Sequence, residues 1–176
     1  MMEGKQMKLI DANPRKGEYE DYITTHISNV QRAWRECLRD KAPEDIRHSV
    51  DNLIDNHDAS KFSDEEWNAY LNYFYPVEGA DNDKEAIDKA FDYAWNHHQK
   101  VNPHHWQYWV LVKDEGSLVA LDMPLKHILC MLADWHSFYY VNPERSTQQW
   151  YLENGPKMTL SPQTRQVVEE YLEYLH

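Results

Sequence analysis

Three things are scarce in this sequence of 176 residues: glycine, cysteine and positive charge. Only five glycines are present, which argues against a many-stranded barrel, and neither glycine-rich phosphate motif, GxGxxG or GxxxxGK[ST], occurs. The two cysteines, Cys37 and Cys130, lie in apolar helical contexts, so we expect reduced core residues of a cytoplasmic protein. We expect no signal peptide, because no apolar run follows the first residues.

The charge balance is strongly negative. Lysine and arginine total 18 against 30 aspartates and glutamates, which gives a net charge of −12 at pH 7. Such a surface repels phosphate backbones and anionic lipid headgroups, so we expect neither general nucleic-acid binding nor membrane attachment. No apolar stretch reaches membrane-spanning length. A small, diffusible substrate fits this charge better than a polymer does.

Apolar residues recur at helical spacing along most of the chain, which is long enough to bury one core. We predict an all-α fold, a helical bundle that forms a single domain over residues 1–176, with residues 1–17 as a loosely ordered N-terminal arm. A short β-hairpin is predicted within residues 109–121, where two apolar runs flank the string Lys-Asp-Glu-Gly-Ser. The helices are expected at about residues 18–39, 43–57, 63–75, 84–99, 124–140 and 161–175.

Two helix starts have a local signature. The string Ser63-Asp-Glu-Glu66 is typical of a capping box, in which the first and fourth side chains bond each other's backbone amides. We therefore predict that the third helix begins at this string. Ser161-Pro162 is typical of an N-cap followed by a proline in the first turn, and it predicts the start of the last helix.

The most informative feature is a set of polar residues at positions that should be buried. His26 lies on the apolar stripe of the first helix, and the pair His57-Asp58 ends the second. Asp134 lies in the middle of the most apolar helix, where a carboxylate without a partner would cost several kcal/mol. A metal ion is the natural partner for imidazoles and carboxylates that separate helices bring together.

The order of these residues resembles the HD-domain superfamily of metal-dependent phosphohydrolases, whose signature is a His, a His-Asp pair and a late Asp. Here the signature is His26, His57-Asp58 and Asp134, and the string His57-Asp-Ala-Ser-Lys61 looks like the HDxxK form common in that superfamily. The resemblance covers about residues 19–140. The string HHQKVNPHHW over residues 97–106 further resembles an uncharacterised bacterial and phage family of HD-like proteins, which brings no known substrate.

The resemblance implies a metal centre and names its ligands. Similar proteins hold a divalent ion (Mn, Fe, Co, Ni or Zn) on residues that match His26, His57, Asp58 and Asp134. Members with two further histidines between the pair and the last Asp hold two ions, often iron, and the Asp of the pair bridges them. We therefore expect one or two metal ions per chain.

Two pairs of histidines are candidates for the extra ligands. His98 is a better candidate than His97, because it continues the apolar face of its helix while His97 is rotated about 100° away. The sequence does not decide between His104 and His105, and we favour His105.

From these residues we predict a metal-dependent phosphohydrolase of a small phosphorylated compound, with nucleotides among the candidates. Asp58 would act at the metal, and Lys61 would bind a phosphate oxygen. Two alternatives stay open: a mixed-valent di-iron oxygenase, which needs both extra histidines, and a non-enzymatic phage or host interaction protein with a structural metal. Plainer interpretations exist for Lys61, as a solvated charge, and for Asp134, as a salt-bridge partner of Lys126 or Arg145. The sequence leaves the oligomeric state open.

Overall fold

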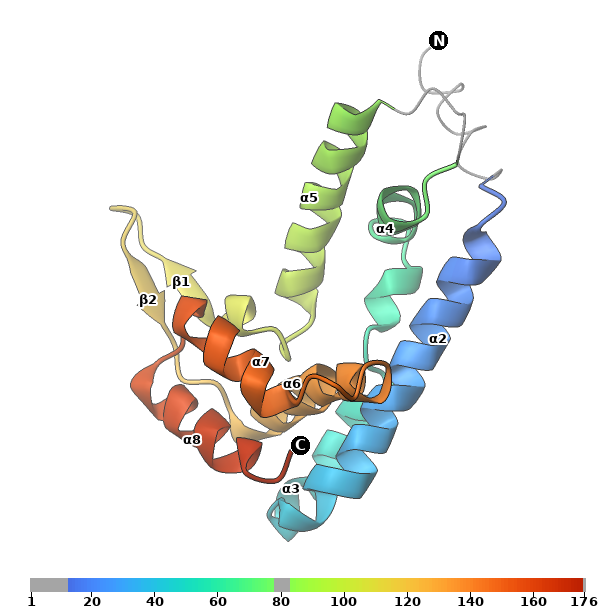
Figure 1. Cartoon of the computed structure of the whole chain (residues 1–176). Helices are drawn as coiled ribbons and strands as arrows, with labels where there is room; N and C mark the ends of the chain where they lie inside the picture. Colours follow the sequence, from blue (N-terminus) through green and yellow to red (C-terminus); the bar gives the residue numbers. More distant parts are fainter. Residues whose placement is uncertain (1–12, 78–82, 176) are drawn as a thin grey trace. The chain divides into compact units, whose positions relative to one another are not determined.

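A computed structural model describes residues 13–77 and 83–175, most of which are helical (Figure 1). The prediction of an all-helical fold with one short hairpin is confirmed. Among the described residues, no helix is both long and apolar enough to cross a membrane. The α-helices and strands are α2 Lys16–Ala33, α3 Glu44–Asp55, α4 Trp67–Phe74, α5 Lys84–Val101, β1 Val110–Val112, β2 Leu118–Ala120, α6 Leu125–Ser137, α7 Thr147–Asn154 and α8 Pro162–Leu172.

The chain forms two compact units. Of the described residues, one unit contains those up to Thr25 and those within Asp58–Val101, and the other contains His26–His57 and those from Asn102 to Leu175. The single domain expected over residues 1–176 stays a prediction. The arm expected over residues 1–17 falls mostly on residues 1–12, which lie outside the described residues, and α2 begins at Lys16.

The first unit contains α4 and α5, which meet through aromatic rings. Phe91 of α5 stacks on Tyr73 with 4.0 Å between ring centroids and meets the edge of Tyr70 at 5.1 Å. The same face of α5 carries Ala94 and His98, which are both buried. A regular helical stripe therefore delivers a histidine to the interior of this unit.

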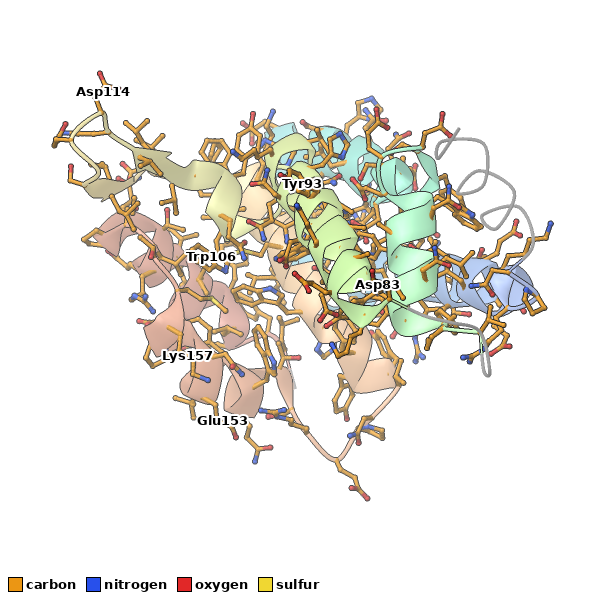
Figure 2. All side chains as sticks on the ribbon, turned by 90° about the horizontal axis from the view of Figure 1, so that it is seen from above. Asp83, Tyr93, Trp106, Asp114, Glu153 and Lys157 are labelled. Carbon is orange, nitrogen blue, oxygen red and sulfur yellow. The ribbon has the colours of Figure 1, made fainter. Side chains whose placement is uncertain are left out.

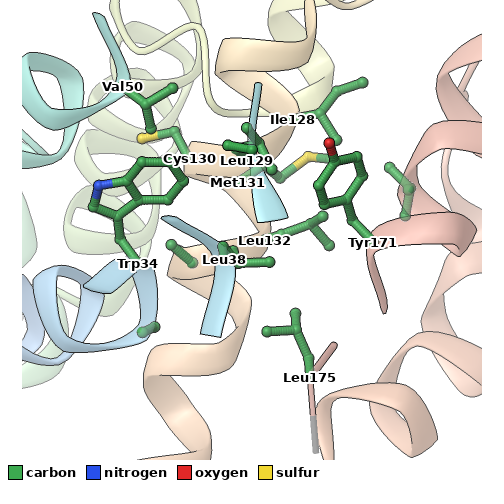
Figure 3. Close-up of a cluster of buried hydrophobic side chains, with 14 of the residues drawn as sticks. Trp34, Leu38, Val50, Ile128, Leu129, Cys130, Met131, Leu132, Tyr171 and Leu175 are labelled. Carbon is green, nitrogen blue, oxygen red and sulfur yellow. The ribbon is translucent and has the colours of Figure 1, made fainter. Parts of the chain in front are cut away.

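The second unit is built around α6. This helix is apolar on most of its circumference, so nearly every residue from His127 to Ser137 is buried. α3 and α8 both pack against it. Figure 3 shows the resulting core, in which α6 contributes the central layer. Its members include Trp34, Leu38, Val50, Ile128, Leu129, Met131, Leu132, Tyr171 and Leu175.

The hairpin of the second unit has the predicted form. Its strands are antiparallel, with Val110 opposite Ala120 and Val112 opposite Leu118. The turn contains Asp114, at the tip in Figure 2, and Gly116, whose φ of 84° lies in the left-handed region that favours glycine.

The first and third predicted helices depart most from their expected bounds, while those expected to end at residues 140 and 175 end at Ser137 and Leu172. The first was expected to run to residue 39, but α2 ends at Ala33 and continues as a π-helical turn over Trp34–Leu38. The wider turn buries both Trp34 and Leu38. The third was expected to begin at Ser63, but α4 begins at Trp67, because the Glu66 side chain bonds two histidines instead of capping the helix.

One helix, α7, was not predicted. It has the capping box that its sequence Ser146-Thr-Gln-Gln149 encodes, since Ser146 Oγ accepts a hydrogen bond from the Gln149 amide at 3.1 Å. Only two side chains of α7 are buried, those of Thr147 and Tyr151. The sequence therefore has no apolar stripe that would predict this helix.

A polar contact also supports the second unit. Asp51 of α3 accepts a hydrogen bond from the buried indole Nε1 of Trp34 at 2.7 Å, and its two oxygens accept from Arg39 at 2.9 and 3.0 Å. The hydrogen bonds from Arg39, assisted by Trp34, lower the pKa of Asp51 to about 2 against the opposing effect of burial.

Replacing Asp51 with alanine should lower the free energy of unfolding by about 2 kcal/mol, because a buried indole N–H loses its acceptor. Asp51→Asn should lose less, since the amide oxygen can still accept. Because the pKa of Asp51 is lowered, the carboxylate makes its full contribution to stability above pH 3.8. That contribution is lost as the pH falls toward 2. Urea denaturation measures the effect, with exposed Asp55→Ala on the same helix as control. A loss below about 0.5 kcal/mol for Asp51→Ala would contradict the assignment.

Candidate metal centre

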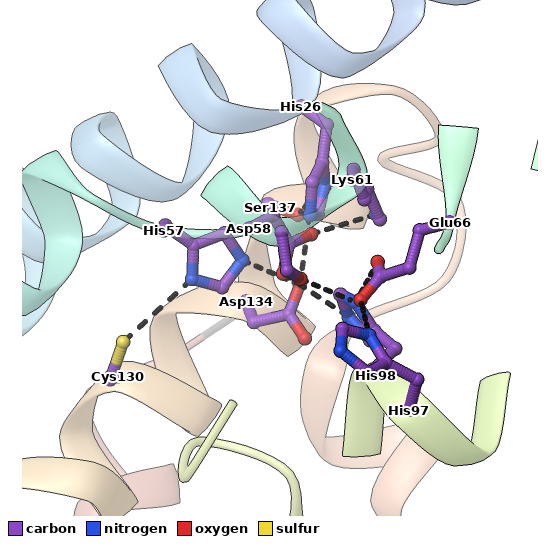
Figure 4. Close-up of polar contacts among 11 residues, drawn as sticks. His26, His57, Asp58, Lys61, Glu66, His97, His98, Cys130, Asp134 and Ser137 are labelled. Atoms are coloured by element: carbon purple, nitrogen blue, oxygen red, sulfur yellow. Dashed lines mark hydrogen bonds and ion pairs between the residues drawn. The ribbon is translucent and has the colours of Figure 1, made fainter. Parts of the chain in front are cut away.

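Three of the predicted ligands meet inside the second unit. His26 Nε2 lies 3.2 Å from Asp134 Oδ1, and His57 Nε2 lies 3.7 Å from the same oxygen (Figure 4). The two histidine side chains are buried, and the Asp134 side chain keeps 13 % of its surface exposed. One ligand atom of each residue lies within 4.8 Å of the others, so this group could hold a metal ion.

Each member of this group comes from a different element. His26 is three residues after Ile23 and four before Val30, which are both fully buried, so helical spacing alone turns it inward. His57 follows the end of α3, in the turn that closes that helix. Asp134 lies in the last part of α6, where every other residue except the half-buried Trp135 is buried. The arrangement agrees with the expectation that separate helices bring these donors together.

The Asp134 carboxyl is ionised despite its environment. Burial by itself would raise its pKa, but the contacts from His26 and His57 hold that pKa well below 3.8. The group is therefore a carboxylate next to two imidazoles at neutral pH. Two nitrogen donors and one anionic oxygen donor are a set that divalent Mn, Fe, Co, Ni and Zn ions accept.

Two more residues of α6 contact the histidines of this group from the other side of their rings. Ser137 Oγ lies 3.2 Å from His26 Nδ1, and Cys130 Sγ lies 3.8 Å from His57 Nδ1. Cys130, Asp134 and Ser137 are spaced by four and three residues, which places them on one face of the helix. A histidine that binds metal through Nε2 carries its proton on Nδ1, and these two side chains are placed to accept it.

Asp58, Lys61 and His98 meet inside the first unit. Asp58 Oδ2 lies 2.7 Å from Lys61 Nζ, and Asp58 Oδ1 lies 3.3 Å from His98 Nε2. Asp58 has a φ of 55°, and no other non-glycine residue in the described ranges has a positive φ. Aspartate tolerates this conformation better than most residues, although it still costs energy, and such backbone strain is concentrated at functional sites. The roles of Asp58 and His98 as ligands, and of Lys61 as a phosphate-binding cation, stay predictions.

Glu66 was not predicted as part of any site. Its side chain is fully buried, and its two oxygens lie 2.8 Å from His97 Nδ1 and 2.7 Å from His98 Nδ1. Burial, the largest single effect, would raise the pKa of Glu66, but the hydrogen bond and charge of His98 together with the hydrogen bonds from His97 and Ser60 lower it overall. Burial likewise opposes the raised pKa of His98, which comes from the hydrogen bonds with Asp58 and Glu66. His98 is thus held between two carboxylates, while His97 stays partly exposed.

The interpretation of residues 63–66 as a capping box assigned the Glu66 side chain to the helix start and not to these histidines. A signal was present, since Glu66 precedes Tyr70 by one helical turn and Tyr70 lies on the buried face of α4.

The structure also places the two histidines after α5. His104 is buried, and its ring centroid lies 4.2 Å from that of His57. His105 is half-buried, with its ring 4.3 Å from that of His104. The preference for His105 as a ligand stays a prediction. Residues in a loop follow no periodic pattern, so nothing in the sequence could have shown which of the two approaches His57.

Residues 15–174 match the model of a family described as "Family of unknown function (DUF5662)". The chain belongs to this family. No curated protein and no solved structure matches it. The family description carries no activity, so the resemblance to HD-domain proteins rests on the ordered His and Asp residues, and the buried groups described above are compatible with a metal site.

Replacing Glu66 with alanine should lower the free energy of unfolding by about 3 kcal/mol. The reason is that buried His98 loses one of the two carboxylates that raise its pKa. The adjacent, exposed Glu65→Ala is the matched control and should change it by less than about 0.5 kcal/mol. Urea denaturation measures the free energy of unfolding of each variant, and amide hydrogen exchange shows whether the loss of stability includes α5. Equal effects of the two variants would show that the Glu66 contacts contribute nothing.

The same pair predicts a pH dependence. Because the pKa of His98 is raised, its full contribution to stability is present below pH 6.5. That contribution is lost as the pH rises through the raised value. The lowered pKa of Glu66 makes its contribution complete above pH 4.5 and lost as the pH falls. The stability difference between the wild type and Glu66→Ala should therefore be greatest between pH 4.5 and 6.5 and shrink on either side. Denaturation curves over this range measure it, and a flat difference would contradict the pairing.

Proposed function

We propose that the protein is a metal-dependent hydrolase of small phosphorylated compounds, and that His26, His57 and Asp134 hold its divalent ion. The observation that carries this proposal is the meeting of two buried imidazoles and an ionised carboxylate from three separate elements, with ligand atoms within 4.8 Å of one another. Buried titratable groups with strongly shifted pKa values are concentrated at functional sites, and this donor set suits a divalent cation.

The donor set favours a working metal over a purely structural one. Structural zinc sites usually have four protein ligands and are rich in cysteine thiolates, whereas a three-residue set leaves coordination positions for water and substrate. A divalent ion in such a site acts as a Lewis acid and makes water an effective nucleophile at neutral pH. The chain's own residues orient the donors: Ser137 contacts the far nitrogen of His26, and Cys130 that of His57.

The choice of a phosphorylated substrate rests on two supports. The order of His26, His57-Asp58 and Asp134 resembles that of metal-dependent phosphohydrolases. A net charge of −12 disfavours a polyanion and suits a small compound that carries few charges of its own. In the proposed reaction the oxygen of water attacks phosphorus, the bond from phosphorus to the leaving oxygen breaks, and that oxygen takes up a proton.

The metal site is tested first, by binding and not by activity. The Mn²⁺ affinity of the metal-stripped full chain should be at least about 100-fold weaker in Asp134→Asn and in His26→Gln than in the wild type. Asp122→Asn is the control, because this aspartate of the same unit accepts a hydrogen bond from Ser161 and lies outside the group. Wild-type affinity in both site variants, with circular dichroism showing that they are folded, would overturn the ligand assignment.

The reaction is tested separately. The wild type loaded with Mn, Co or Fe should release phosphate from at least one member of a panel of nucleotides and sugar phosphates, and Asp134→Asn should not. Failure across the panel with metal demonstrably bound would overturn the hydrolase proposal while leaving the site intact. Two iron ions per chain with substrate-dependent oxygen uptake would support the oxygenase alternative instead.

A further inference from the structure

We propose that Cys130, His57 and His104 form a second metal site in the second unit, selective for thiophilic ions such as Zn²⁺, Cd²⁺ and Cu⁺. Its occupation would compete with the ion on His26, His57 and Asp134, because both sites use the ring of His57. The proposal of a second site does not depend on which reaction the protein performs.

The geometry of the three donors suits a single ion. Cys130 Sγ lies 3.8 Å from His57 Nδ1, and the His57 and His104 rings have centroids 4.2 Å apart. One ligand atom of each residue lies within 4.8 Å of the others, and all three side chains are buried. Zinc bonds of about 2.3 Å to sulfur and 2.0 Å to nitrogen place the two ligand atoms roughly 3.5 Å apart in a tetrahedral site. The observed separation needs only a small adjustment.

The chemistry of the donors separates the two sites. The set around Cys130 has a sulfur and no carboxylate, whereas the set around Asp134 has a carboxylate and no sulfur. Soft ions prefer thiolate and imidazole, while harder ions such as Mn²⁺ prefer carboxylate oxygen. The second cysteine is in a different environment, since Cys37 is half-buried with its sulfur 4.0 Å from Tyr140 Oη.

The ring of His57 links the two sites. Cys130 and Asp134 are one turn apart on α6, and His57 presents Nδ1 to the first and Nε2 to the second. A neutral imidazole has one nitrogen with a free electron pair and one that carries the proton. An ion on Nδ1 therefore moves the proton to Nε2 and removes a ligand from the Asp134 set. Because binding coupling is reciprocal, each ion weakens the other by the same factor.

The site is tested on the reduced, metal-stripped full chain with Cd²⁺ and Co²⁺. Both ions give a thiolate-to-metal charge-transfer absorption, which we expect in the wild type at one ion per chain. Cys130→Ser and Cys130→Ala should lose this absorption, while Cys37→Ser should keep it. Asp134→Asn should also keep it, because that residue belongs to the other set. Absence of the band in the wild type, or its survival in folded Cys130 variants, would overturn the proposal.

Competition tests the shared ring. One equivalent of Cd²⁺ should weaken Mn²⁺ binding, measured by electron paramagnetic resonance of free Mn²⁺, by at least tenfold in the wild type. In Cys130→Ser the same addition should change the Mn²⁺ affinity by less than twofold. Unchanged Mn²⁺ affinity in a wild type that shows the cadmium–thiolate band would overturn the claim that the sites share His57. Failure of Asp134→Asn to weaken Mn²⁺ binding is a separate result, which bears on the hydrolase proposal alone.

Discussion

The contact between Asp134 and its two histidines is the constraint on which the second unit depends. α6 is buried on most of its circumference, and a carboxylate placed there must find compensating charge or hydrogen bonds. His26 and His57 supply them from other elements, so α2 and the end of α3 must approach α6 at the level of Asp134. Apolar packing of Trp34, Val50 and their neighbours around α6 makes this approach favourable. The core and the site are thus two consequences of one helix being buried on most of its circumference.

α6 also determines how the histidines are oriented. With Asp134 one turn after Cys130 and three residues before Ser137, one face of this helix contacts Nδ1 of His57, Nε2 of both histidines, and Nδ1 of His26. Rings held at both nitrogens have little freedom to rotate, which preserves the site without an ion. As a consequence, His57 belongs to two donor sets, one with the Asp134 oxygen and one with the Cys130 sulfur. If both proposed sites bind metal, their selectivity depends on which nitrogen of that ring carries the proton.

Periodic features were predictable from the sequence, and single contacts were not. The apolar stripes that predict α2, α3, α5, α6 and α8 also turn His26 and His98 inward, because burial of those histidines follows from helical spacing alone. Short α7 lacks such a stripe, and the stripe of the first helix does not indicate that α2 gives way to a π-helical turn at Trp34. Glu66 matched a local capping pattern, and although its spacing from Tyr70 indicates an inward position, no local rule identifies its partners, which are more than 30 positions away. The same limit applies to His104, whose neighbour His57 is set by tertiary packing.

The family to which the chain belongs has no described activity. The function therefore has to be inferred from the site and not from the fold. Many helical bundles bury a histidine, and a His-Asp pair occurs often by chance. A carboxylate whose pKa is held low by two imidazoles, on a helix whose adjacent turns contact the far side of each ring, is a far more specific arrangement. It is compatible with a metal ion, and it says nothing about a substrate. Metal binding is therefore the first property to establish, since both the hydrolase and the oxygenase interpretations require it and differ only in what the ion does next.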